Sequence, residues 1–123
     1  MTIRGIRGAT TIESDTKDNI LSATKELLDA ILAANLGLQT DDIASAIFTV
    51  TDDVVSAYPA LAARQIGWTQ VPMMCAREIP IEGSLPLCIR VLIHWNTEKP
   101  QSEIKHIYLR EAVRLRPDWI AAP

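Results

Sequence analysis

Two features that would place a protein in or across a membrane are missing from this sequence. No apolar run approaches the ~18 residues that a membrane-spanning helix requires. The first residues, MTIRGIRGATTIESD, contain no apolar stretch of the kind found in secretion signals. We therefore expect no membrane association and a cytoplasmic location.

Cysteine is also scarce, since the chain has only Cys75 and Cys88. The pair fits neither a disulfide framework nor a CxxC metal motif. On folding, a chain of 123 residues buries roughly two-thirds of the surface that it exposes when unfolded, so it needs no disulfide bonds for stability. We predict two buried, reduced thiols, which agree with a reducing compartment.

Lysine is less common than arginine, with four lysines against eight arginines. The net charge of −3 argues against nucleic acid as the main partner, because phosphate binding requires a basic face. The planar guanidinium of arginine binds carboxylates through two parallel hydrogen bonds, whereas lysine is the ordinary solubilising cation. An acidic chain rich in arginine indicates a small anionic ligand.

The motifs of common enzyme classes are absent as well. His94 and His106 do not have metal-ligand spacing with carboxylates, and there is no G-x-S-x-G motif or Ser/His/Asp order. The segment GIRG lacks the glycine pattern of a phosphate-binding loop. Covalent catalysis by Cys75 would need a nearby base and a lowered pKa, and the sequence indicates neither. We expect no metal and no cofactor, and a chemistry that needs only a preorganised field and a shaped pocket, such as a unimolecular pericyclic rearrangement.

The hydrophobic pattern predicts strands that alternate with helices in one domain, residues 1–123, with 117–123 as a C-terminal tail. Strands are predicted over residues 2–11, 46–51, 70–76, 86–95 and 105–109. Helices are predicted over residues 13–35 and 55–66, with short turns at 40–42, at 98–104 and from 110. We expect Ser14 or Asp15 to cap the long helix, and Gly37 and Gly67 to end the two helices.

This order predicts an α+β fold, a mixed five-stranded sheet with two main helices on one face. Two helices cannot hide both faces of a five-stranded sheet. The other face must therefore meet another subunit or an aqueous cavity, and closed cyclic assembly is the usual solution.

Polar residues interrupt segments that otherwise pattern as buried: Arg7, Glu78, Arg90 and Tyr108. Arg90 lies in the middle of PLCIRVLIHW, where an uncompensated guanidinium would cost roughly several kcal/mol. One interpretation is a buried salt bridge between Glu78 and Arg90. The other is a cluster of arginines whose positive charge a dicarboxylate ligand would neutralise. That cluster comprises Arg7, Arg64, Arg90 and Arg116. Tyr108 is either a core tyrosine whose hydroxyl reaches solvent, or a residue whose hydroxyl donates a hydrogen bond to a carboxylate of the ligand.

Several blocks, in order along nearly the whole chain, resemble the trimeric α/β class of chorismate mutase. The blocks are IRGIRGATT, YPALAAR, GW, VPMMCARE, LCIRVLIH and HIYLREAVRLRPD. The resemblance implies a homotrimer whose sheets surround a barrel-like core, with active sites between subunits. It also implies a cofactor-free Claisen rearrangement of chorismate, a dianion, to prephenate in phenylalanine and tyrosine biosynthesis.

The same resemblance implies roles for individual residues. Arg90 is expected beside the ether oxygen of the breaking C–O bond, and Glu78 at the ring hydroxyl. Arg7 and Tyr108 are expected to hold the enolpyruvyl carboxylate. The remaining positions implied to lie around the substrate are Tyr58, Ala60, Arg64, Met74, Cys75, Leu115 and Arg116, with the tail after Pro117 closing the mouth.

Two positions depart from the family pattern. Leu61 stands where the family often has lysine, and Met74 where a small polar residue is expected. We expect weaker substrate capture from the first change and an altered pocket floor from the second.

Two other functions remain open: imine hydrolysis by a trimer of the reactive-intermediate deaminase type, and a non-catalytic sensor of an aromatic-pathway metabolite. The quoted blocks match the deaminase family much less well. A sensor would need no cation at an ether oxygen.

Overall fold

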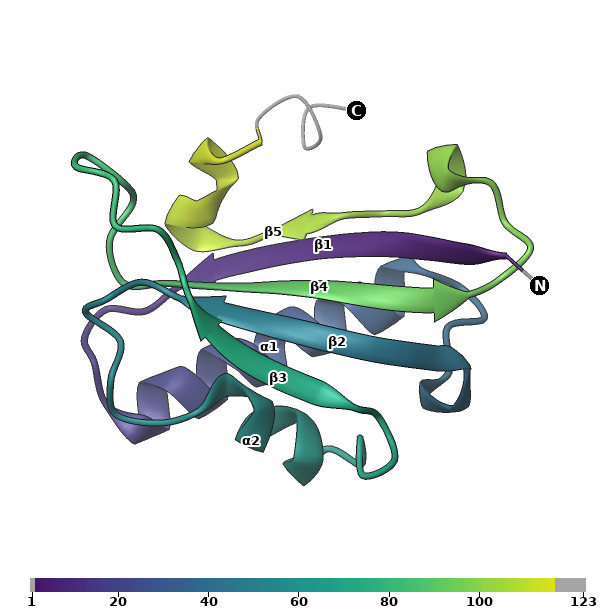
Figure 1. Cartoon of the computed structure of the whole chain (residues 1–123), viewed down its shortest axis with the longest axis horizontal. Coiled ribbons are helices and arrows are strands. Elements are labelled where there is room, and N and C mark those ends of the chain that lie inside the picture. Colours follow the sequence, from purple (N-terminus) through teal and green to yellow (C-terminus); the bar gives the residue numbers. More distant parts are fainter. Residues whose placement is uncertain (1, 117–123) are drawn as a thin grey trace.

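A computed structural model of the chain describes residues 2–116 (Figure 1). The strands are β1 (Ile3–Thr11), β2 (Ile43–Val50), β3 (Met73–Arg77), β4 (Cys88–Asn96) and β5 (Ile107–Tyr108), and the α-helices are α1 (Lys17–Ala34) and α2 (Pro59–Gln65). Short 3₁₀ helices span Thr40–Asp42, Gln101–Glu103 and Arg110–Arg114.

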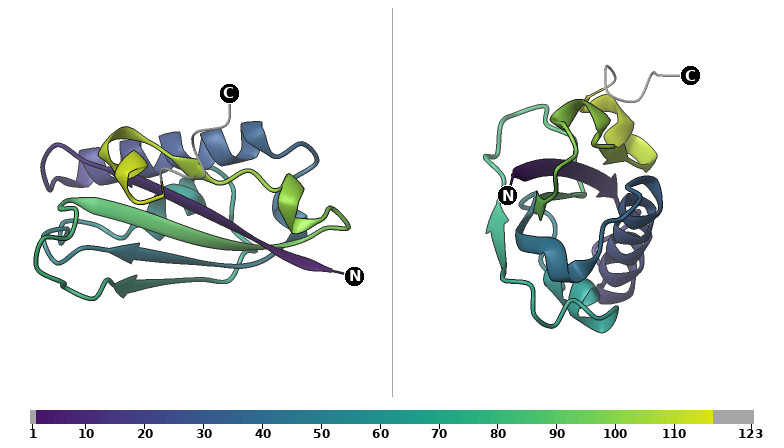
Figure 2. Two further views of the ribbon diagram at one scale, coloured as in Figure 1. Left: turned by 90° about the horizontal axis from the view of Figure 1, so that it is seen from above. Right: turned by 90° about the vertical axis from the view of Figure 1, so that its right-hand side faces the viewer.

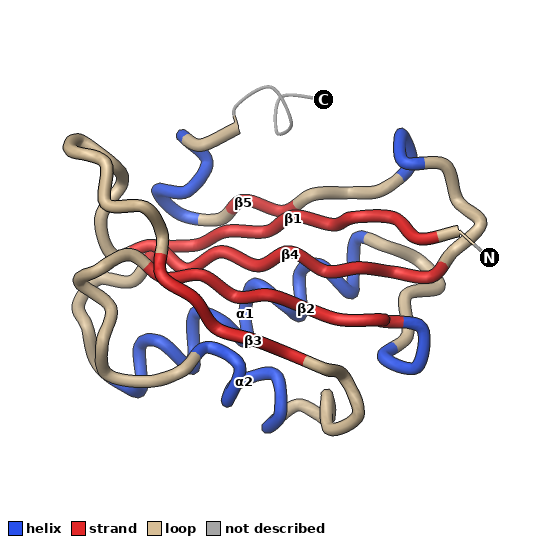
Figure 3. The backbone as a smooth tube through the Cα atoms, in the orientation of Figure 1, coloured by secondary structure: helices blue, strands red, loops and turns tan. Residues whose placement is uncertain are grey.

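The strands form one sheet in the order β3-β2-β4-β1-β5. Strand β4 is antiparallel to both of its neighbours, β1 and β2. The edge strands are parallel to theirs, β3 to β2 and β5 to β1. The sheet is therefore mixed and five-stranded, as the sequence predicts, and Figure 3 shows the strands side by side.

Both helices lie on the same face of the sheet, as the two further views in Figure 2 show. Helix α1 buries an apolar stripe, of which Leu27, Leu28 and Ile31 are fully inaccessible. Strand β1 comes close to this stripe at Gly8, where a Cβ atom would lie 2.8 Å from Ile31 Cδ1. Within residues 2–116 no α-helix covers the opposite face, which is called the open face below.

The start of α1 differs from the expectation. Thr16, and not Ser14 or Asp15, is the N-cap, and its Oγ1 accepts the Asn19 N–H at 3.1 Å. Ser14 instead accepts a hydrogen bond from the Asn19 side-chain amide at 3.0 Å. The helix ends at the C-cap Asn35, and Gly37 adopts φ of +86° two residues later.

Helix α2 is shorter than predicted because residues 55–58 form a loop. Proline favours the first turn of a helix, and it disfavours helical backbone in the residue before it. Pro59 accordingly begins α2. Strand β3 likewise begins at Met73, directly after Pro72, which offers no N–H to the ladder but accepts the Ala46 N–H at 3.0 Å.

Candidate active site

Arg90 lies in the middle of a row of paired residues that crosses all five strands. The row is Ala76, Thr49, Arg90, Ala9 and Tyr108. Paired residues share a face of a sheet, and neighbours along a strand alternate between faces. Ile89 and Val91 belong to the buried core. The row therefore faces away from the helices, and Arg90 projects onto the open face.

Among the described residues, Arg90 forms an ion pair with one carboxylate, that of Glu78, which directly follows β3. Arg90 Nε lies 3.7 Å from Glu78 Oε2, and the two side chains are 24% and 26% exposed. Thr49 Oγ1–H donates to the same carboxylate oxygen. Arg90 Nε is nevertheless buried with no hydrogen-bond partner among the described residues. The salt bridge of the first interpretation exists, but it is only partly buried and leaves Nε without a hydrogen bond.

A second cationic region adjoins the row through Arg7. Arg7 lies two residues before Ala9 on β1, so its side chain lies on the same face as Arg90. The Arg7 N–H donates to His106 Nδ1 at 3.0 Å. Burial of His106, together with the positive charges of Arg7 and Arg116, lowers the pKa of His106. A bound anion would stabilise this region of positive potential.

The far end of the row is apolar. Tyr108 is 5% exposed and packs against Ala9 and Ala112, with Leu85 and Leu115 beside them. Tyr108 is thus a buried residue at the same end of the open face as Leu115.

The two thiols differ in environment. Cys88 is fully buried, and burial raises its pKa while the positive charge of Arg90 opposes that rise. Cys75 is only half-buried, so the prediction of two buried thiols is wrong for it. Cys75 sits on the edge strand β3, where fewer neighbours can cover a side chain than on a central strand.

A cleft of about 540 Å³ lies at this edge of the sheet, between β3 and the loop that leads into α2. We call it the edge cleft. Tyr58, Leu61 and Cys75 are among its lining residues. Cys75 packs against the helix-side core, whereas its neighbour Met74 points to the open face and is 69% exposed. The edge cleft therefore lies along the β3 edge of the sheet, where its lining includes helix-side Cys75 as well as Ala76 from the row of Arg90.

Within one chain, the predicted site residues fall into two groups. The open-face group comprises Arg7, Met74, Glu78, Arg90, Tyr108, Leu115 and Arg116, and the edge-cleft group comprises Tyr58, Leu61 and Cys75. Arg64 is exposed in the last turn of α2, and Ala60 is buried in the same helix. The predicted closure by residues after Pro117 lies outside the described residues.

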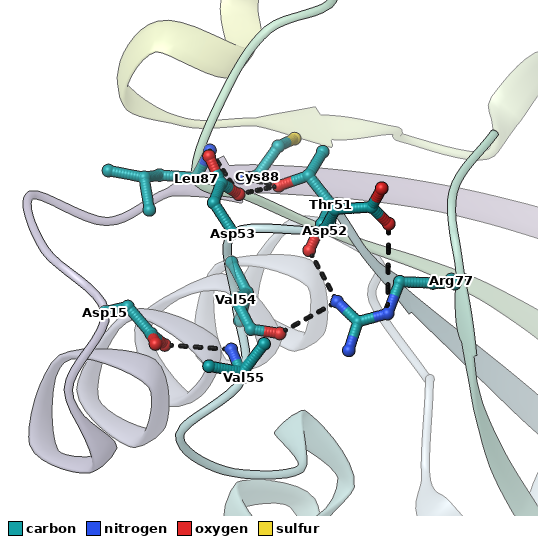
Figure 4. A network of polar contacts seen from close by, with 9 residues as sticks. All are labelled: Asp15, Thr51, Asp52, Asp53, Val54, Val55, Arg77, Leu87 and Cys88. Carbon is teal, nitrogen blue, oxygen red and sulfur yellow. Dashed lines mark hydrogen bonds and ion pairs between the residues drawn. The ribbon is translucent and has the colours of Figure 1, made fainter. Parts of the chain in front are cut away.

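Sequence reasoning missed the anchoring of the loop that carries Tyr58 (Figure 4). Arg77 Nη1 donates to the carbonyl oxygens of Thr51 and Val54 at 2.9 and 3.1 Å. The Asp53 carboxylate accepts the Leu87 N–H at 3.0 Å, where Leu87 has φ of +50°. The sequence indicates only that charged residues lie near strand ends, Arg77 at the end of β3 and Asp53 shortly after β2. Their hydrogen-bond partners cannot be predicted from the sequence, because they are distant along the chain.

Asp15 provides the third anchor of this loop. Its carboxylate accepts the N–H groups of Val55 and Ser56, both at 3.1 Å. The loop is thereby tied to the start of α1, to the end of β3 and to the start of β4. The wall of the edge cleft is preorganised by these contacts.

Two kinds of feature are absent from the part of the chain that the structure describes. Among residues 2–116, no group of three or more His, Cys, Asp or Glu side chains could hold a metal ion. No helix in that same part of the chain is long and apolar enough to cross a membrane.

The fold and these side chains define a small α+β protein that carries guanidinium groups on the open face of its sheet. Known proteins share this architecture. The model of the family "Chorismate mutase type I" matches residues 3–119. Chorismate mutase AroH of Thermus thermophilus is 59% identical over 121 residues, which cover 98% of each chain.

Two further similar proteins are also chorismate mutases. Chorismate mutase AroH of Bacillus subtilis (strain 168) is 44% identical over 119 residues, covering 96% of this chain and 93% of the relative. A solved chorismate mutase from Clostridium thermocellum is 51% identical, with a TM-score of 0.85, and the match covers 88% of this chain and 96% of that one. The chain belongs to the chorismate mutase type I family and is therefore an isomerase, which confirms the resemblance and the predicted fold class.

Proposed function

We propose that this chain catalyses the Claisen rearrangement of chorismate to prephenate in phenylalanine and tyrosine biosynthesis. The single observation that carries the mechanism is the state of Arg90. Its Nε is buried on the open face, 3.7 Å from one carboxylate oxygen and without a hydrogen-bond partner among residues 2–116. The Arg90 side chain is 24% exposed, so N–H groups of the guanidinium other than the buried Nε can donate to an oxygen atom of a ligand.

The reaction needs charge stabilisation more than proton transfer. As the C–O bond of chorismate lengthens, negative charge grows on the ether oxygen, and the fixed Arg90 cation stabilises it. An interaction that strengthens in the transition state lowers the barrier. A million-fold acceleration needs about 8 kcal/mol, of which a preorganised charge supplies roughly 3–4 kcal/mol and orientation of the flexible ether supplies most of the rest.

The other open-face residues position the substrate. Glu78, which pairs with Arg90, would also accept the ring hydroxyl proton. Arg7 and Tyr108 would bind the enolpyruvyl carboxylate. Leu115 would pack on the substrate, and Arg116 with the tail 117–123 would assist anion capture at the mouth.

The proposed enzyme is a homotrimer with a barrel-like core, formed by whole chains that each act as one domain. The open face exposes apolar side chains on adjacent strands, Ile47 at 36% and Met74 at 69%. Apolar groups of this kind favour burial between subunits. The edge cleft of a neighbouring subunit would then bring Tyr58, Cys75 and Leu61 to the open-face residues, with Met74 at the floor and Ala60 and Arg64 near the wall and mouth.

The proposed location is the cytoplasm. Both cysteines are free thiols, which suits a reducing compartment. The acidic net charge of −3 suits a small-molecule substrate better than nucleic acid.

A direct assay tests this function. Purified protein is mixed with chorismate in the presence of a chelator, the loss of the conjugated-diene absorbance is followed, and the product is identified by mass spectrometry. Formation of prephenate supports the proposal. Binding of chorismate without turnover would instead indicate a sensor, and turnover abolished by the chelator would contradict the cofactor-free mechanism.

A further inference from the structure

Among residues 2–116, Lys17 is the one cation in the lining of the edge cleft that makes no hydrogen bond or ion pair. We infer that Lys17 is a further substrate-binding residue, which captures a carboxylate of the anionic substrate at this cleft. The inference rests on the proposed function, because it takes the substrate to be a dianion. It adds a residue on α1 that neither the family motifs nor the open-face group includes.

The charge balance of the cleft identifies Lys17. The lining residues include two cations, Lys17 and Arg77. Arg77 is already engaged, since its Nη1 donates to the carbonyl oxygens of Thr51 and Val54 and its Nε lies 3.9 Å from Asp52 Oδ1 (Figure 4). The Lys17 ammonium has no hydrogen bond or ion pair within residues 2–116. It is the cation in this lining that remains available to a ligand.

Lys17 does not stabilise the helix on which it lies. Lys17 is the first residue of α1, directly after the N-cap Thr16. The N-terminus of a helix carries partial positive charge, so a cation there is unfavourable. By contrast, Asp18 in the same turn suits the dipole. The Lys17 side chain is exposed and the fold does not fix it, so its ammonium is free to reach a ligand in the edge cleft.

The rest of the cleft explains why a cation is needed there. Its volume of about 540 Å³ is within the range of small-molecule sites. Much of its lining is apolar, including Val54, Val55 and Leu61. A carboxylate entering an apolar cleft loses hydration and requires a compensating charge. Leu61 cannot supply it, whereas Lys17 lines the same cleft.

The chemistry of lysine sets the kind of effect to expect. Lysine is a mobile point charge on a flexible stem, which suits capture of an anion more than orientation of a reacting bond. A contact made equally in the bound substrate and in the transition state changes KM and leaves kcat nearly unchanged. Lys17 should therefore contribute to substrate affinity.

The test compares Lys17→Gln with the matched control Lys25→Gln in steady-state kinetics with chorismate. Lys25 is on the same helix but pairs with Asp29 at 2.7 Å and does not line the cleft. For Lys17→Gln we expect KM to rise about ten-fold, with kcat within about two-fold of the wild type. Lys17→Arg should restore most of the affinity, and the dependence of KM on salt should be weaker in Lys17→Gln.

The outcomes separate this inference from the proposed function. An active wild type whose KM rises no more in Lys17→Gln than in Lys25→Gln overturns the inference alone. A KM increase that accompanies a lower melting temperature also overturns it, because loss of an unfavourable cation at a helix start should leave stability equal or higher. A wild type that does not convert chorismate overturns the proposed function, and this inference with it.

Discussion

Replacement of Arg90 by lysine gives the sharpest test of the proposed mechanism. The guanidinium is held on the open face by its neighbour Glu78, 3.7 Å from Nε, with its side chain 24% exposed. Lysine keeps the positive charge but replaces a planar fork with a mobile ammonium. It therefore removes orientation while it leaves the net charge of the site unchanged.

The expected losses of kcat and of stability follow from the two roles of the Arg90 side chain, as a donor to the substrate and as the ion-pair partner of Glu78. Loss of one preorganised donor at a developing negative charge costs about 10²- to 10³-fold in kcat. The ion pair with Glu78 is partly solvated, so its contribution to the free energy of unfolding is no more than about 1 kcal/mol. We expect Arg90→Lys to lose most of its activity while its melting temperature falls by no more than about 5 °C.

The assay measures kcat and KM with chorismate, together with thermal unfolding and oligomeric mass. Arg4→Lys serves as the control, because Arg4 points to the other face of β1 and its Nε donates to the Lys99 carbonyl oxygen at 2.8 Å. The control should retain nearly full activity. An Arg90→Lys variant with a kcat within ten-fold of the wild type would remove Arg90 from the central role.

Three further predictions concern stability. Gly8→Ala should lower the free energy of unfolding by about 1 kcal/mol, since the new Cβ would lie 2.8 Å from Ile31 Cδ1 in the packed core; urea denaturation measures this change. Thr16→Ala should cost about 1 kcal/mol in the same assay, because it removes the acceptor of the Asn19 N–H at 3.1 Å. Folding lowers the pKa of His106 from an ordinary value of 6.5. The unfolded chain therefore takes up the proton first, and the stability present above pH 6.5 is lost progressively as the pH falls from 6.5 through the lower pKa of the folded chain. His106→Asn, which keeps an acceptor for the main-chain N–H, should reduce that loss when denaturation is measured as a function of pH.

Each of these has a matched control. Gly5→Ala should cost less than Gly8→Ala, because the nearest atom to its Cβ is at 3.8 Å, and equal losses would refute the packing argument. Ser14→Ala should cost less than Thr16→Ala, and the reverse order would mean that Ser14 is the cap. An unchanged pH dependence in His106→Asn would show that other groups cause it.

The sequence alone determined the features that depend on local periodicity. Alternation within IRGIRGATT and CIRVLIHW assigns Arg7 and Arg90 to faces of their strands, and the 3.6-residue stripe of α1 identifies the helical face that packs on the sheet. These patterns sufficed for the fold class and the open face. Capping near residue 16 was less certain from sequence, because Ser14, Asp15 and Thr16 are all competent caps and the choice depends on which backbone groups lie nearby.

Only the tertiary structure decided which residues meet. Arg77 and Asp53 hold the loop of the edge cleft through partners 23 to 34 positions away, and no local pattern encodes such pairs. The same is true of Cys75 and Arg90, which one chain places on opposite sides of its sheet. Periodicity sets the direction of a side chain, whereas strand order and register set its neighbours, and these arise from long-range hydrogen bonding across the whole sheet.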